Sequence, residues 1–419
     1  MTAALILIKR TLAALAASAL AAGCAAIGPQ ALLGTRLQYN EVVKTTTEEQ
    51  LLLNIVRLRY TDTPSSLAVS TIAAQFERAQ GAGLTPFFTA AGGDNNRSYS
   101  LILPQAQITS ADRPTFSLTP LDDQEFTRKL FTPLPLEGLL YLTKTTWPIS
   151  TVFRLYLENL NWVPNAQTAS GPTPLEAPVY SEFKSGVEML QRLQSRGLIV
   201  FGSEERSEAL GSPLPASSIT ARDVIEAARN GYEYRRDETG ASWTLYKKSQ
   251  QPVLHIAPAA ADSHEMTLVR RVFRLKPGLA KYDITQETLN PFPSSYPPEG
   301  VANIDLETRS LLQALYFVSH GIEVPPEHHA RGLVVVTRDK GGQVFDWREV
   351  TSGLFRVRFS AQRPSTAHIA VPYQGHWFYI DESDHETKAT FTLLMQLARL
   401  ELTGKTGAGP VLTLPLGGR

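Results

Sequence analysis

The feature that most limits the fold of this chain is its single cysteine, Cys24, among 419 residues. One cysteine excludes a disulfide within the chain, and it excludes a zinc site built from several cysteines. Stability must therefore come from a buried core. Hydrophobic residues make up 43% of the chain and charged residues 19%, which is ordinary for a globular protein and too apolar for a disordered one. The length allows about two or three domains.

The charge balance of the chain bears on whether it binds nucleic acid. Lys and Arg together number 40, and Asp and Glu together number 40, so the formal net charge is zero. A nucleic-acid-binding protein should carry a basic surface, and no cluster of Lys and Arg suggests one here. We therefore expect no nucleic-acid partner.

The first residues of the chain have the pattern of an export signal. Lys9 and Arg10 are followed by an uncharged, mainly apolar run over residues 11–22. This length is typical of a signal peptide, since a membrane-spanning helix needs about 20 apolar residues. Ala22 and Gly23, directly before Cys24, are small enough for a peptidase to bind the segment in extended form. The sequence predicts a signal peptide over residues 1–23.

The string Ala21-Ala22-Gly23-Cys24 resembles the bacterial lipobox, in which the cysteine thiol takes up diacylglycerol. It departs from the pattern at Ala21, where Leu is commoner. Apolar residues 3–8 also precede the positive pair. Ordinary secretion with cleavage after Ala21 stays an alternative, whereas Lys9 and Arg10 argue against an uncleaved membrane helix.

The resemblance to lipoproteins implies where the protein resides. Bacterial lipoproteins carry two or three acyl chains, which makes their anchoring stable, because one chain alone binds a membrane only marginally. Ala25 stands where an Asp would resemble the signal for retention in the inner membrane. We therefore expect lipid on Cys24, and a protein anchored in the outer membrane and facing the periplasm.

The mature chain mixes helical and extended patterns. Thr46 and Glu49 fit a capping box before an apolar helical face that ends near Leu58. Prolines and glycine over residues 164–182 suggest a boundary. Asp305 is expected to cap a buried helix, and Ser383 to open the last helix with Glu386. Strands are expected over residues 67–71, 98–103, 115–119, 198–201, 232–236, 243–247, 253–256, 333–337, 354–360, 367–371 and 376–380.

The strands of the last third follow one another without crossover helices, which favours an α+β fold with mainly antiparallel sheet and two packed subdomains. The predicted organisation is a signal peptide (1–23), a lipidated tether (24–42), an N-terminal α+β region (43–163), a Pro-rich linker (164–182), a C-terminal α+β region (183–402) and a tail or edge strand (403–419).

No familiar catalytic motif is found. The sequence contains neither a G-x-S-x-G elbow nor an H-E-x-x-H zinc motif. Gly404-Lys405-Thr406 lacks the earlier glycine that a phosphate-binding loop requires, and it follows a helix instead of a strand. We predict no catalytic residue and no cofactor.

Two groups of histidines and carboxylates are the candidates for a metal site. The first comprises His320, His328 and His329, near Glu323 and Glu327, and a solvated loop is its simpler interpretation. The second comprises His376, Asp381, Asp384 and His385, where the two aspartates are expected to cap a strand-to-helix turn.

Three strings are similar to a loosely defined set of uncharacterised bacterial envelope lipoproteins: YNEVVKTTTEEQLLLNIVRLRY, PTFSLTPLDDQEF and HWFYIDESDHETKATFTLLMQL. This set implies no activity. We therefore favour a non-enzymatic binding or assembly module of the cell envelope, whose partners are the membrane, through its lipid, and other envelope proteins. The alternative is a periplasmic metal-assisted hydrolase that uses one of the histidine groups.

Overall fold

The computed structural model describes residues 27–65, 67–88, 100–120, 124–145, 147–286, 297–402 and 412–415. Cys24 and the predicted signal peptide lie outside these residues. The chain divides into two compact units. The first unit comprises Met1–Gln50, Ser65–Asp122 and Lys405–Arg419. The second unit comprises Leu51–Pro64 and Asp123–Gly404. This division differs from the predicted one, since residues 164–182 lie within the second unit, where Ala166 and Ala169 are buried.

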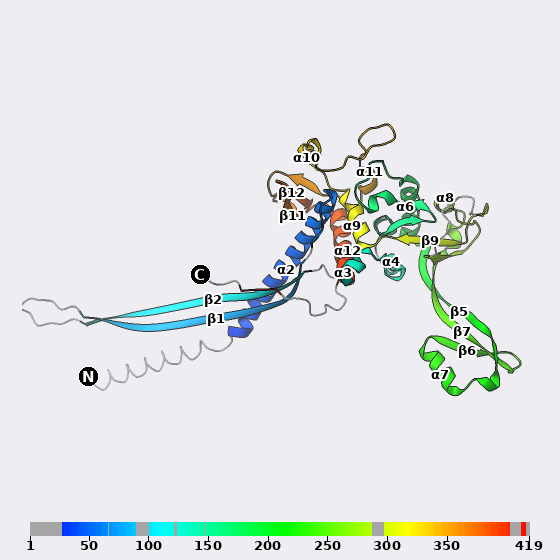
Figure 1. Ribbon diagram of the computed structural model, residues 1–419, viewed down its shortest axis with the longest axis horizontal. Helices are drawn as coiled ribbons and strands as arrows, with labels where there is room; N and C mark the ends of the chain where they lie inside the picture. Colours follow the sequence, from blue (N-terminus) through cyan, green and yellow to red (C-terminus); the bar gives the residue numbers. More distant parts are fainter. Residues whose placement is uncertain are drawn as a thin grey trace, which may run out of the picture. The chain divides into compact units, whose positions relative to one another are not determined.

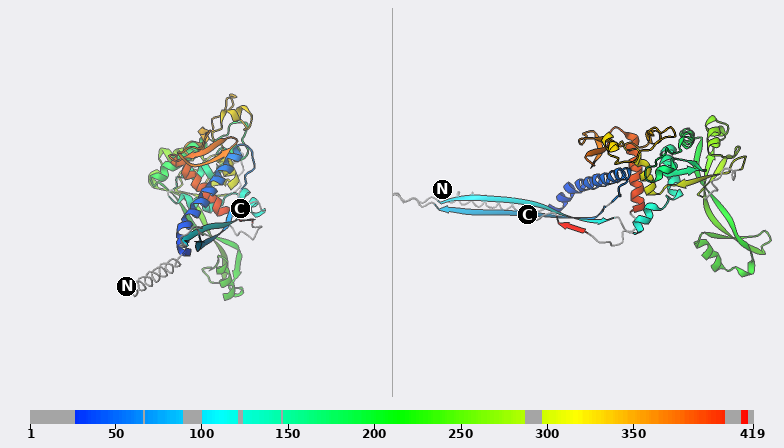
Figure 2. Two further views of the ribbon diagram at one scale, coloured as in Figure 1. Left: turned by 90° about the vertical axis from the view of Figure 1, so that its left-hand side faces the viewer. Right: turned by 45° about the horizontal axis from the view of Figure 1, so that its top comes forward.

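The first unit is built around a long antiparallel hairpin. Strand β1 (Leu67–Phe88) pairs with β2 (Ser100–Pro120) along its whole length, and β13 (Leu412–Pro415) adds to the outer edge of β2. Figures 1 and 2 show β1 and β2 side by side from several directions. The strands predicted at 67–71 and 115–119 are parts of this hairpin. The segment from Gly81 to Phe88 continues strand β1 despite its glycines, because its backbone pairs with β2.

Helix α2 (Ile27–Arg59) is longer than predicted and begins inside the segment expected to be a tether. Ion pairs of Lys44 with Glu41 and Glu48, one turn apart, favour helix there. The predicted N-cap at Thr46 is wrong, because Thr46 lies within the helix and its hydroxyl donates to the carbonyl of Val42 at 2.8 Å. No helix in the described part of the chain is long and apolar enough to cross a membrane.

The second unit contains one sheet of seven strands and one of three, with helices between them. The large sheet has the order β4-β3-β9-β8-β7-β5, and β6 also pairs with β7. Its pairs are antiparallel apart from β8 and β9. The small sheet is antiparallel, with the order β10-β12-β11. The strands are β3 (Leu157–Leu160), β4 (Val163–Pro164), β5 (Ile199–Pro215), β6 (Tyr232–Arg236), β7 (Ser242–Ile256), β8 (Lys281–Thr285), β9 (Asn303–Thr308), β10 (Arg358–Ser360), β11 (Ala367–Tyr373) and β12 (His376–Asp381).

Most helices of this unit pack around one continuous hydrophobic core, but the helix at Ala221–Arg229 has no buried residue. Pro148 is the N-cap of the helix Ile149–Tyr156. The described helices are α3 (Gln124–Phe131), α4 (Leu136–Thr143), α5 (Ile149–Tyr156), α6 (Ser181–Ser195), α7 (Ala221–Arg229), α8 (His264–Val272), α9 (Leu311–Ser319), α10 (Pro326–Ala330), α11 (Arg348–Thr351) and α12 (His385–Leu402). The α+β fold with mainly antiparallel sheet is thus confirmed.

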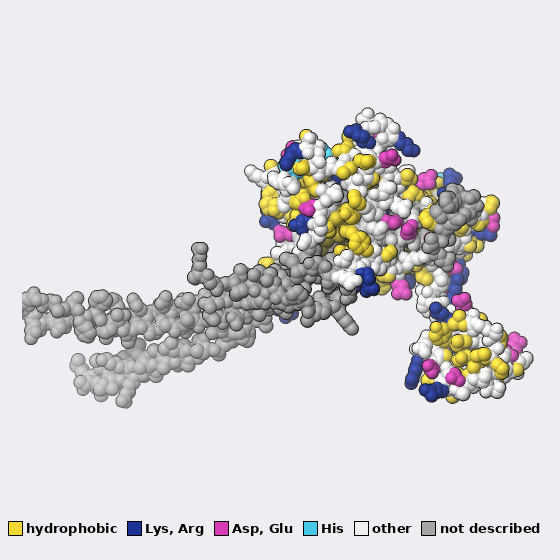
Figure 3. Space-filling model, in the orientation of Figure 1, with side chains coloured by type: hydrophobic (Ala, Val, Ile, Leu, Met, Phe, Trp, Pro, Cys, Tyr) yellow, Lys and Arg dark blue, Asp and Glu magenta, His cyan; other side chains and the backbone are white. Residues whose placement is uncertain are grey.

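Strands β5 and β7 extend beyond the core as a two-stranded ribbon that carries α7 and β6 at its far end (Figures 1 and 2). Residues 202–215 are mostly polar but continue β5, because β7 pairs with their backbone up to Leu210 and again from Leu214. Between residues 202 and 252 no residue is buried. Hydrophobic side chains therefore lie on the surface of residues 202–252 (Figure 3). Leu214 and Ile225 are two of the exposed hydrophobic residues there.

Three other elements differ from the sequence prediction. Asp305 does not cap a helix, because it lies in β9; the helix begins after Ser310, which forms the capping box with Gln313. Residues 333–337 are not a strand, and only the following residue, Arg338, forms isolated bridges, with Glu176 and Val344. The strand predicted over 354–360 is shorter, since β10 comprises only Arg358–Ser360.

Candidate functional site

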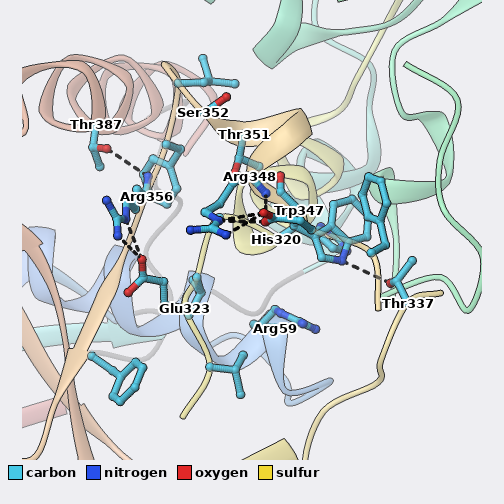
Figure 4. A pocket seen from close by; sticks show the side chains of 18 of the residues that line it. Arg59, His320, Glu323, Thr337, Trp347, Arg348, Thr351, Ser352, Arg356 and Thr387 are labelled. Carbon is cyan, nitrogen blue, oxygen red and sulfur yellow. Dashed lines mark hydrogen bonds and ion pairs between the residues drawn. The ribbon is translucent and has the colours of Figure 1, made fainter. Parts of the chain in front are cut away.

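A cavity of about 700 Å³ opens within the second unit. Its walls come from the end of α2, the chain after α9, the segment 336–348 around Trp347, and the segment from α11 to β10. In Figure 4, Arg59 projects from α2 on one side, His320 and Trp347 lie together on another, and Glu323 and Arg356 form a third. The size suits a small molecule, because ligand pockets have volumes of about 300–1,000 Å³.

Arg59 is the last residue of α2 and lies on the apolar face of that helix, four residues after Ile55. Only 5% of it is exposed. Its Nη1 donates to the hydroxyl of Thr173 at 2.9 Å, and its Nε has no hydrogen-bond partner among the described residues. No described carboxylate pairs with it. Burial lowers the pKa of Arg59 to about 10, so the side chain is still a cation at neutral pH.

His320 follows α9 and stacks on the indole of Trp347, with ring centroids 4.0 Å apart. The Nδ1 of His320 lies 2.8 Å from the carbonyl oxygen of Tyr316, and because a carbonyl only accepts, Nδ1 carries the proton. Burial, together with the charge of Arg59, lowers the pKa of His320 to about 3. The imidazole is therefore neutral, and its Nε2 is a buried acceptor that finds no donor in the described part of the chain.

Local backbone pairing and one side-chain hydrogen bond position His320 and Trp347. Gly321 comes directly after His320, and a Cβ at this position would lie 2.4 Å from the carbonyl oxygen of Phe355. The absence of a side chain lets the two backbones pair: Val357 N donates to Gly321 O at 3.0 Å, and Glu323 N donates to Val357 O at 2.9 Å. On the far wall, the indole Nε1 of Trp347 donates to the hydroxyl of Thr337 at 3.2 Å.

The other cations along the cavity have carboxylate partners. Arg356 Nε donates to Glu323 at 2.7 Å, and Arg348 binds Asp346 through both Nε and Nη2. The guanidinium of Arg348 lowers the pKa of the Asp346 carboxyl. Both pairs are largely exposed, so solvent screens them. They balance their own charge and leave that of Arg59 uncompensated.

A second cluster joins residues from both predicted histidine groups. The hydroxyl of Tyr60 lies 2.7 Å from Nδ1 of His328, and His328 meets His376 edge to face at 5.0 Å between ring centroids. His376 Nε2 lies 2.8 Å from a carboxylate oxygen of Glu327. Burial and the neighbouring His376 lower the pKa of His328. This cluster can hold a proton network, and its rings also contact Tyr373, Phe378 and Phe359.

The predicted metal candidates are thus dispersed. His320 and His329 line the cavity, while His328 and His376 belong to the other cluster. Among the residues that the structure describes, no three His, Cys, Asp or Glu side chains are grouped to hold a metal ion.

The predicted capping role of the two aspartates is confirmed. Asp381 accepts from the backbone N–H of Ser383 at 3.0 Å, and Asp384 accepts from that of Thr387 at 3.0 Å. The N-cap of the last helix is therefore Asp384 and not Ser383, since Ser383 instead donates its hydroxyl to Asp381. His385 is exposed at the first position of this helix.

Sequence reasoning missed Arg59 and Trp347. A signal for Arg59 was present, because the spacing of Leu52 and Ile55 places it on the buried face of the helix. A charged side chain on such a face needs an explanation. Trp347 gave no comparable signal, since it lies in a segment without regular periodicity.

Comparison of this chain with family models, with curated proteins and with solved structures gives no match.

Proposed function

We propose that this protein is a non-enzymatic binding module of a bacterial cell envelope, held at the outer membrane by lipid on Cys24. Its ligand enters the cavity beside Arg59. The observation that carries the proposal is the buried charge of Arg59, which has no carboxylate partner in the described chain. Burying a charge that has neither an anion nor a full set of hydrogen bonds is costly, and a ligand that supplies them would offset that cost.

The chemistry of the cavity favours binding over catalysis. His320 has a pKa of about 3 and cannot exchange protons near neutral pH, where a general acid or base should titrate. The arginines at the opening are neutralised by Glu323 and Asp346. What remains is a fixed cation, a fixed acceptor and an aromatic wall, which are groups that recognise a ligand.

The binding role is tested on the full-length lipidated protein, extracted from its own membrane in mild detergent and examined by native mass spectrometry. We expect a bound small molecule that disappears in Arg59→Met. The matched control is Arg196→Met, which removes an exposed arginine paired with Glu265 outside the cavity. A bare wild-type mass, or the same adduct in both variants, would contradict the binding role.

The anchor is tested separately with Cys24→Ser. The lipid accounts for membrane attachment, because several acyl chains each contribute about 0.8 kcal/mol per buried CH₂. We expect Cys24→Ser to fractionate with the soluble proteins of the periplasm. Fractionation with membranes, as for the wild type, would show that lipid on Cys24 is not the anchor. Stoichiometric zinc or manganese that is lost in His328→Ala/His376→Ala would instead favour the metal-assisted hydrolase.

A further inference from the structure

We infer that the cavity binds a small organic oxyanion, a carboxylate or a phosphate, that carries an O–H or N–H donor next to the charged group. The inference rests on the proposed binding function and names the ligand class for that site. Three features of the cavity support it, namely a cation, an acceptor and an apolar wall.

The cation is Arg59, whose planar guanidinium matches the geometry of carboxylate and phosphate oxygens. The carboxylates that line the cavity are already committed. Glu323 and Asp346 pair with arginines, Asp384 caps its helix, and Glu386 lies in the field of Arg154. An incoming oxyanion therefore supplies the charge that the described chain does not offer, whereas a metal cation would be repelled by Arg59.

The acceptor is His320. Its Nδ1 proton is committed to the carbonyl of Tyr316, so Nε2 presents a lone pair and no proton. A bare carboxylate would satisfy Arg59 and leave this acceptor unpaired. A ligand with a hydroxyl or N–H group beside the oxyanion would satisfy both. Because buried polar groups are normally hydrogen-bonded, the second group adds specificity.

The apolar wall is formed by Val336, Val344, Phe345 and Phe359, which lie among the residues that line the cavity. Phe345 meets Trp347 edge to face at 5.3 Å. Val344 is 64% exposed, so its side chain is available for contact with a ligand. The remainder of the ligand is therefore expected to be hydrophobic.

A matched set of probes separates these contributions, with binding to the full-length protein in detergent measured by calorimetry. Mandelate has a ring, a hydroxyl and a carboxylate. Phenylacetate lacks the hydroxyl, 1-phenyl-1,2-ethanediol lacks the charge, and benzyl phosphate replaces the carboxylate by phosphate. We expect mandelate to bind about tenfold more tightly than phenylacetate, as one hydrogen bond allows. The diol should not bind measurably. Whichever of phenylacetate and benzyl phosphate binds more tightly identifies the oxyanion.

The variants assign each effect to a residue. Arg59→Met should weaken mandelate binding about 100-fold. Arg59→Lys should weaken it less, because Lys keeps the positive charge but loses the two parallel N–H donors of the guanidinium. His320→Phe should remove the preference for mandelate over phenylacetate while both still bind. Arg196→Met should leave all affinities unchanged. A folding defect is detected by the thermal unfolding of each variant, and Arg59→Lys keeps the test decisive if Arg59→Met does not fold.

The outcomes distinguish this inference from the proposed function. Two results would overturn the oxyanion inference. One is equal affinity for the diol and for mandelate. The other is no binding of any anion at about 10 mM, a concentration above the dissociation constants of ordinary small-ligand sites. An uncharged molecule that native mass spectrometry finds in the wild type, and that Arg59→Met loses, overturns it too but leaves the binding module intact. Absence of both a native adduct and probe binding overturns both.

Discussion

Arg309 and Arg59 are two buried arginines of the second unit, and the structure treats them in opposite ways. Arg309 donates to the hydroxyl of Ser170 and to the carbonyls of Arg154, Leu155 and Asn165, and it lies 4.0 Å from the ring centroid of Phe317. Arg59 donates one hydrogen bond, to Thr173, and its Nε has no partner among the described residues. Neither forms an ion pair with a carboxylate in the described chain.

The difference in hydrogen bonding separates a buried arginine that stabilises the fold from one that is available to a ligand. Arg309 connects the end of α5 with Asn165, which follows β4, and with η1 (Gln167–Ser170), so its hydrogen bonds serve the fold. Burial lowers the pKa of Arg309 to about 9, and the side chain stays charged. Arg59 contributes little of this kind and lines a cavity. A buried charge that the fold does not use is the better candidate for a ligand contact.

The largest expected effect comes from Arg309→Met. This change removes four hydrogen bonds and takes the side-chain donor away from the buried carbonyls of Leu155 and Asn165, whereas the carbonyl of Arg154 still accepts from Asn165. We expect a loss of about 3–5 kcal/mol in the free energy of unfolding, measured by chemical denaturation. A loss below about 1 kcal/mol, which is within the range of one ordinary hydrogen bond, would remove the contrast with Arg59.

Gly321→Ala tests whether the cavity depends on the close approach of two backbones. The added methyl group would meet the carbonyl of Phe355, which cannot rotate away as a side chain could. We expect a cost of about 1–3 kcal/mol in unfolding free energy, because overpacking forces backbone shifts. Mandelate binding should also weaken, since His320 is the preceding residue. Gly138→Ala is the control, because open space surrounds that position.

The acid sensitivity of the fold tests the neutral state of His320, which faces Arg59, Arg309 and Trp347. Its pKa is about 3 in the folded protein, against about 6.5 in an unfolded chain. The unfolded state therefore binds a proton first as pH falls, and stability is lost below pH 6.5. Between pH 7 and pH 5 the loss from this group is about 2 kcal/mol.

His320→Gln should lose that much less on acidification than the wild type, as measured by denaturation at both pH values. Taking the difference between the two proteins cancels the other titrating groups. His385→Gln serves as control, since it removes an imidazole that folding leaves exposed. Equal pH dependence of His320→Gln and the wild type would show that His320 is not held neutral.

The sequence predicted the fold class and several local features, because those depend on periodicity and on caps. Asp381 and Asp384, for example, accept from backbone N–H groups at the turn before α12, as expected. The ribbon of β5 was not predicted, since its polar, Gly- and Pro-containing sequence is paired by β7 over many residues and not by local preference. The site was not predictable in the same way. His328 and His376 are 48 residues apart and meet only through tertiary structure, whereas Arg59 carried a readable signal in its helical face.

The smallest effect on stability is expected for Arg59→Met, and it completes the comparison with Arg309. The change loses one hydrogen bond to Thr173, and it also removes a buried charge that has no anionic partner. These two contributions oppose each other, so the unfolding free energy should stay within about 1 kcal/mol of the wild type. The same substitution should abolish ligand retention. A loss as large as that of Arg309→Met would mean that Arg59 serves the fold after all, and the cavity would then lack the spare charge on which binding of an oxyanion depends.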